Sequence, residues 1–144
     1  MSTPARLREA IDDLNFFEDR SERIQALIDL ANQWQGVPES VAARPYDRNH
    51  QVHGCESEVY VFAVGDANQV QFHVAVENPQ GMSAMAMAAL LTQTINGLSA
   101  ADIAAIDENI VYEVFGRELS MGKSMGLMGM IRLMKALAAN LKTG

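Results

Sequence analysis

Residues 57–77 read SEVYVFAVGDANQVQFHVAVE, and the alternation of side chains in this stretch predicts a β-hairpin. The first part, residues 57–64, is rich in β-branched and aromatic residues, which favour a strand. Gly65-Asp66-Ala67-Asn68 is predicted to form the hairpin loop. In residues 69–77, apolar residues alternate with more polar ones, so one face of this strand is predicted to be more exposed to solvent. Because two antiparallel strands are not stable alone in water, helices must cover one face of the sheet.

Helical periodicity on both sides of the hairpin supplies these helices. Before the hairpin, one helix is predicted to begin near Pro4 and a second to begin after Asp19. After the hairpin, helices are predicted over residues 83–96 and 124–141, with a short helix between them. The predicted fold class is therefore α+β, a small antiparallel sheet covered on one face by helices, in a single domain over residues 1–144.

Residues 36–51, between the second helix and the hairpin, show no periodicity and predict a long surface loop. Shortly after this loop comes Cys55, the only cysteine of the chain. A single thiol forms no internal disulfide and no multi-cysteine metal site, so inert packing, intermolecular pairing and nucleophilic chemistry remain open. Because Cys55 follows a glycine and has polar neighbours, we expect it at an accessible loop tip.

The acidic charge balance restricts the possible partners. With a formal net charge of −7, binding to nucleic acid or to anionic membranes is disfavoured, because both require a basic surface. We recognise no signal peptide, and the most apolar stretch, residues 82–91, is too short to span a bilayer. One unpaired cysteine without an export signal indicates a protein of the reducing cytoplasm.

The segment around the cysteine, Val52-His53-Gly54-Cys55-Glu56-Ser57-Glu58-Val59-Tyr60, resembles the sulfur-acceptor loop of the SufE family of iron–sulfur assembly proteins. The resemblance extends to the second predicted helix at residues 22–31 and to the segment Leu119-Ser120-Met121-Gly122-Lys123-Ser124-Met125-Gly126-Leu127. Met121-Gly122 departs from the Pro-Ser pair of the family. The resemblance covers nearly the whole chain in the family's order, and it implies the fold that the family shares with the IscU-type cluster scaffolds.

What the resemblance implies is a sulfur relay. A cysteine desulfurase, which uses pyridoxal phosphate, holds sulfur as a persulfide, and the family's thiolate attacks the terminal sulfur and delivers it to an iron–sulfur scaffold. In this chain the implied acceptor is Cys55, and no cofactor of its own is expected. The chain would act as a carrier and activator of the desulfurase rather than as a stand-alone enzyme. We expect His53, Gly54, Glu56 and Ser57 to support the acceptor loop, although His53 does not belong to the family motif.

Lys123 stands where the family often carries arginine, and it either contacts the partner or the persulfide or simply faces solvent. Two alternative functions also stay open. The chain is either a docking adaptor that never carries sulfur, or a thiol enzyme in which His53 or His73 activates Cys55. A zinc site is a weaker alternative, because loop spacing alone is a weak signal. Its ligands would be Asp47, His50, His53 and Cys55.

Two further patterns near these residues lead to expectations. Methionines gather around the start of the last predicted helix and at residues 82–87. Core filling is the first interpretation, and a flexible docking surface for the desulfurase is the second. Glu56 and Glu58 are expected to raise the pKa of the Cys55 thiol if they lie close to it. The thiolate would then form only when the docked partner supplies positive charge.

Overall fold

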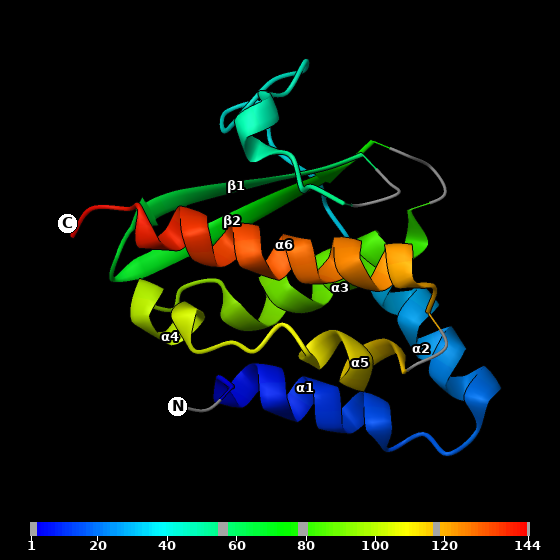
Figure 1. Ribbon diagram of the computed structural model, residues 1–144. Coiled ribbons are helices and arrows are strands. Elements are labelled where there is room, and N and C mark those ends of the chain that lie inside the picture. The colour runs from blue at the N-terminus through cyan, green and yellow to red at the C-terminus, as the bar shows by residue number, and fades with distance from the viewer. Residues whose placement is uncertain (1–2, 55–57, 78–80, 117–118, 144) are drawn as a thin grey trace.

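A two-stranded antiparallel sheet lies above two layers of helices in the computed structural model, which describes residues 3–54, 58–77, 81–116 and 119–143 (Figure 1). This arrangement confirms the predicted α+β class. No helix of these residues is both long and apolar enough to cross a membrane. The elements are α1 (Ala5–Asn15), α2 (Arg20–Ala31), the 3-10 helix η1 (Arg48–His50), β1 (Val59–Asp66), β2 (Gln69–Val76), α3 (Met82–Ile95), α4 (Ala100–Ala104), α5 (Ile110–Phe115) and α6 (Met121–Ala139).

The hairpin has a tighter turn than the sequence predicts. Strand β1 pairs with β2 from Val59 opposite Val76 to Asp66 opposite Gln69. The predicted four-residue loop is wrong in its first half, because Gly65 and Asp66 belong to the strand. The Asp66 carboxylate accepts the Asn68 N–H at 2.8 Å, which closes the shorter turn.

The inner face of the sheet forms the main core. Helix α6 packs against β1, α3 packs against β2, and α1 lies beyond them against α3 and α5 (Figure 1). The buried residues of α1 are those that its helical spacing predicts, Leu7, Ile11 and Leu14. The largest buried side chains of this core include Phe72, Met87, Leu91, Met130, Ile131 and Met134.

The outer face of the sheet is covered by part of the long loop before the hairpin. Tyr46 lies with its ring 5.2 Å from that of Tyr60 and 5.5 Å from that of Phe62, and His50 stacks on Phe62 at 4.5 Å. Residues 36–51 lie at the surface as predicted, since none of them is fully buried, but the packing of their apolar side chains on a second face of the sheet is not predicted. The loop residues that pack there include Val37, Val41, Ala42 and Tyr46.

The helix boundaries after the hairpin also differ from prediction. Helix α6 begins at Met121 rather than near residue 124, because the Ser120 hydroxyl caps it by accepting the Lys123 N–H at 3.2 Å. Helix α5 is not predicted, and with six residues it is too short to show a period. Helix α2 begins after Asp19 as predicted, with the Asp19 carboxylate accepting the Ser21 N–H at 2.8 Å.

Candidate functional site

The base of the cysteine-bearing loop is fixed to the sheet by hydrogen bonds on both sides. The Val52 N–H donates to the Val59 carbonyl at 2.8 Å, and the Glu77 N–H donates to the Glu58 carbonyl at 2.8 Å. The first bond joins the chain entering the loop to β1, and the second joins the chain leaving it to the end of β2. The chain is thus hydrogen-bonded to the hairpin just before His53 and again at Glu58, on the two sides of the predicted acceptor loop.

Two of the five predicted loop residues lie in the described part of the chain. Gly54 has a φ of 79°, a conformation that favours glycine, and no described atom lies within 4 Å of the place where a Cβ would stand. Gly54 and His53 are both exposed. Cys55, Glu56 and Ser57 lie outside the described residues, so the roles assigned to them stay predictions.

Helix α6 contacts the loop at Gly129. A Cβ placed on Gly129 would lie 2.9 Å from the His53 carbonyl oxygen and 3.1 Å from Cγ1 of Val52. The missing side chain therefore lets the loop approach the helix closely. Val52 itself is buried in the main core. The chain that leads to Cys55 is held between β1 on one side and α6 on the other.

The face of α6 that contacts the loop continues toward the start of the helix. Met121, Met125 and Gly129 follow one another at intervals of four, so they lie along one face. Met121 and Met125 are 79% and 50% exposed. The core-filling interpretation is therefore wrong for these two methionines. It is confirmed for three others of the same helix, Met128, Met130 and Met134.

Glu58 has a hydrogen-bond partner on β1. The Tyr60 hydroxyl donates to Oε1 of Glu58 at 3.0 Å. This hydrogen bond, together with desolvation, raises the pKa of Tyr60 above its ordinary value. Tyr60 is 7% exposed and belongs to the cluster of buried residues on the outer face of the sheet. The influence of Glu58 on the Cys55 thiol stays a prediction.

The remaining candidate residues lie in different surroundings. Lys123 is exposed in the first turn of α6, and its partner or persulfide contact stays a prediction. The Nδ1 atom of His50 is buried against the outer face of the sheet and has no hydrogen-bond partner among the described residues. Within the same residues no three side chains of the metal-binding types form a group that could hold a metal ion.

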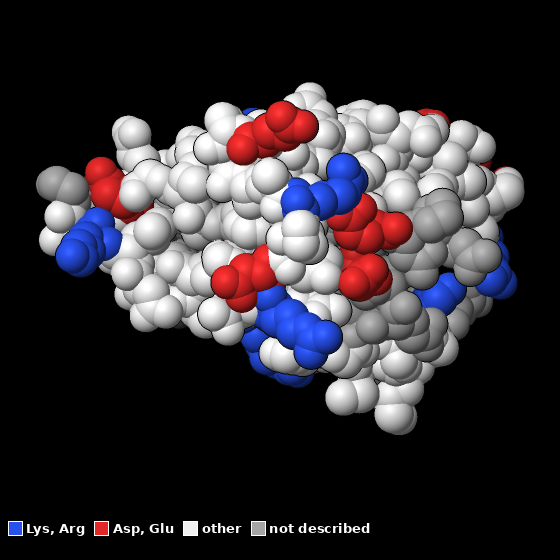
Figure 2. All heavy atoms as spheres, turned by 90° about the horizontal axis from the view of Figure 1, so that it is seen from above, with Lys and Arg blue, Asp and Glu red and all other residues white. Residues whose placement is uncertain are grey.

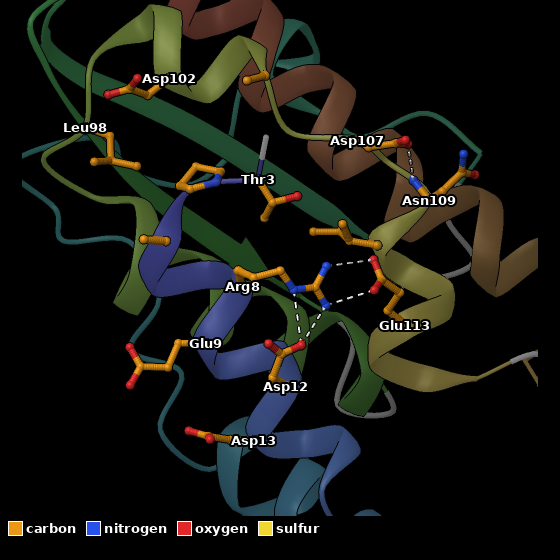
Figure 3. A pocket seen from close by; sticks show the side chains of 14 residues that line it. Thr3, Arg8, Glu9, Asp12, Asp13, Leu98, Asp102, Asp107, Asn109 and Glu113 are labelled. Carbon is orange, nitrogen blue, oxygen red and sulfur yellow. Dashed lines mark hydrogen bonds and ion pairs between the residues drawn. The ribbon is translucent and has the colours of Figure 1, made fainter. Parts of the chain in front are cut away.

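Two hollows of the described structure lie away from the loop base. His73 lines one of about 220 Å³ between β2, α3 and residues 33–36 after α2, and neither His53 nor Gly54 contributes to it. The other, of about 1000 Å³, lies between α1 and the segment of α4 and α5, where Arg8 donates to Glu113 at 2.8 Å (Figure 3). Acidic side chains dominate its lining. They are Glu9, Asp12, Asp13, Asp102, Asp107 and Glu113.

The charged side chains on the side of the molecule that carries the long loop stand in small mixed groups. Figure 2 looks down on this side and shows acidic and basic residues next to each other, with broad uncharged areas between the groups. Arg44 and Glu77 form an ion pair with 2.6 Å between Nε and Oε1. This pair links the long loop to the residue that closes the cysteine loop, so both loops are tied to the same end of β2.

Comparison with known proteins identifies the family of the chain. A sequence model described as "SufE: Fe-S metabolism associated domain" matches residues 8–138. The chain belongs to the SufE family. It is thus associated with iron–sulfur metabolism. No curated protein matches it.

The fold of this SufE-family chain is also similar to a solved structure. A solution structure of a hypothetical protein from Thermus thermophilus matches with a TM-score of 0.76 over 96% of each chain. The two sequences are 20% identical, and at that identity the likeness shows the fold alone.

Sequence reasoning missed one residue of this SufE-family site. Gly129 lies inside a long helix, where glycine costs about 0.5–1 kcal/mol relative to alanine. Such a glycine signals that another part of the chain approaches the helix closely. Nothing in the sequence indicates that the approaching segment is Val52 and His53, more than seventy positions earlier.

Proposed function

We propose that this SufE-family protein accepts sulfur from the persulfide of a cysteine desulfurase on Cys55, stimulates that desulfurase and passes the sulfur to iron–sulfur cluster assembly. One observation carries this proposal. The family match spans residues 8–138, and within it the chain's only cysteine falls in a loop whose base is fixed to the hairpin. The proposed acceptor is the single thiol, in the segment that resembles the family's acceptor loop.

The proposed transfer is an exchange on sulfur without net oxidation. The Cys55 thiolate attacks the outer sulfur of the partner's persulfide, a new S–S bond forms, and the partner's cysteine leaves as a thiolate. The proton released from the Cys55 thiol is taken up by that leaving thiolate or by solvent. Because the chain has no second cysteine, the persulfide on Cys55 cannot be released through an internal disulfide. The sulfur is kept until an acceptor arrives.

The fold supports a carrier that meets its partner at the loop. His53 and Gly54 are exposed beside the acceptor, and Met121 and Met125 are exposed on the α6 face that contacts the loop base. In the proposed complex the desulfurase covers this side of the molecule. Flexible methionine side chains suit such a contact because they adapt to the shape of a partner.

Steady-state turnover of a cysteine desulfurase from the same organism tests the proposal. We expect alanine production to rise and saturate as the wild-type protein is added. Because the chain has one cysteine, alkylation with iodoacetamide gives a matched control that is modified at Cys55 alone, and it should not stimulate. If neither protein changes the turnover, the proposed function is wrong. If small thiol substrates are turned over without any desulfurase, the chain is a stand-alone enzyme instead.

A further inference from the structure

We infer that Gly129 is a positioning residue, which seats the chain entering the acceptor loop against α6 and thereby sets where Cys55 is presented. The contact with His53 and Val52 is the observation that carries this inference. Its meaning for sulfur transfer rests on the proposed function. Its structural part, the placement of the loop base, is independent of that function and is tested separately.

The contact leaves no room for the smallest side chain. An alanine Cβ at position 129 would stand 2.9 Å from the His53 carbonyl oxygen, whereas ordinary van der Waals contact of a Cβ begins at 3.4 Å. The atom it meets is backbone, which does not rotate aside as the end of a flexible side chain does. Either the helix or the loop base must therefore move, by about 0.5 Å if contact is to become ordinary.

The loop base is the side that yields. The neighbours of Gly129 in the helix, Met128 and Met130, are 8% and 0% exposed, so α6 is locked in the core. On the other side, Val52 is buried but His53 and Gly54 are exposed, so less packing opposes a shift at His53 than a shift of α6. The first bond to be strained is the one from the Val52 N–H to the Val59 carbonyl, next to the contact.

The first test is hydrogen exchange of the Val52 amide in the protein alone. In Gly129→Ala we expect this amide to exchange about tenfold faster, because local opening of the loop base becomes easier. The Glu77 amide, which is bonded to Glu58 on the other side of the loop, is the internal reference and should keep its rate. Unchanged exchange at Val52 in the folded variant would overturn the inference.

A second variant controls for helix propensity. Ala136 is exposed in the same helix, and Ala136→Gly changes helix propensity by a similar amount in the opposite direction, without adding an atom beside the loop. It should leave the exchange of Val52 unchanged. If Gly129→Ala fails to fold while Ala136→Gly folds, the inference is also wrong, because the core rather than the loop would then depend on this glycine.

The consequence for transfer is measured with the desulfurase. Misplacement of reacting atoms by about 1 Å can cost roughly a hundredfold in rate, so a shift of about half that size is expected to lower the stimulated kcat about tenfold in Gly129→Ala. The concentration for half-maximal stimulation should change little. If wild-type protein does not stimulate but Val52 exchange responds as expected, the proposed function fails and the positioning of the loop stands. Faster exchange with undiminished kcat would overturn the role of Gly129 in presenting Cys55.

Discussion

Replacing Cys55 with serine is expected to leave desulfurase turnover at the rate of the desulfurase alone. A serine hydroxyl stays protonated at neutral pH and forms no S–S bond, whereas thiolate attack is the step that takes the sulfur away. Since the chain has no other cysteine, no neighbouring thiol can substitute for the lost acceptor. The measurement is alanine production at saturating cysteine over a range of Cys55→Ser concentrations.

The same experiment separates the carrier from the docking adaptor. An adaptor acts by binding, so it would stimulate fully without its thiol, and full stimulation by Cys55→Ser would contradict the carrier. Ala139→Ser, at an exposed position near the other end of α6, introduces the same hydroxyl away from the loop. This control should stimulate as the wild type does.

Replacing Arg23 with alanine is expected to lower the free energy of unfolding by about 2 kcal/mol. The Arg23 guanidinium joins the ends of two helices. It donates to the Leu14 carbonyl at 3.1 Å and the Asn15 side chain at 2.7 Å, and also to the Glu113 carbonyl at 2.7 Å and the Val114 carbonyl. The last carbonyls of a helix have no partner within it, and a cation there interacts favourably with the helix dipole. Alanine would leave these carbonyls at α1 and α5 without their shared donor.

Urea unfolding measures this loss, and two variants give it a reference. Arg23→Lys keeps the charge but lacks the planar fork that reaches both helix ends, so about half of the loss is expected. Arg6→Ala removes a cation from an exposed position of α1 and should change the free energy of unfolding by less than about 0.5 kcal/mol. Equal free energies of unfolding for Arg23→Ala and Arg6→Ala would show that the hydrogen bonds of Arg23 contribute nothing to stability.

The parts of the fold that the sequence predicts are those whose burial repeats along the chain. The two faces of β1 separate as its alternation predicts, with Val59 and Val61 in the main core and Tyr60 and Phe62 under the long loop. The packing of that loop was not predictable. Its apolar residues reach the sheet from positions without a period, so nothing local indicates the face that they cover.

In the candidate site, too, some features follow from the local sequence and others depend on tertiary packing. The acceptor loop stays a prediction from a local motif, and at its entry Gly54 has the positive φ that favours glycine. The contact of Gly129 with His53 joins segments far apart in sequence, and only tertiary packing brings them together. The exposure of Met125 likewise depends on which other segments pack against it, and the helical spacing of the methionines does not predict it.

The central claim is that Cys55 itself carries the sulfur, and intact mass measured without reductant tests it most directly. The protein is incubated with a cysteine desulfurase and free cysteine, next to Cys55→Ser under the same conditions. We predict a gain of sulfur on the wild type that reductant removes, and no gain on the variant. Stimulated turnover without any gain of sulfur on the wild type would contradict the claim.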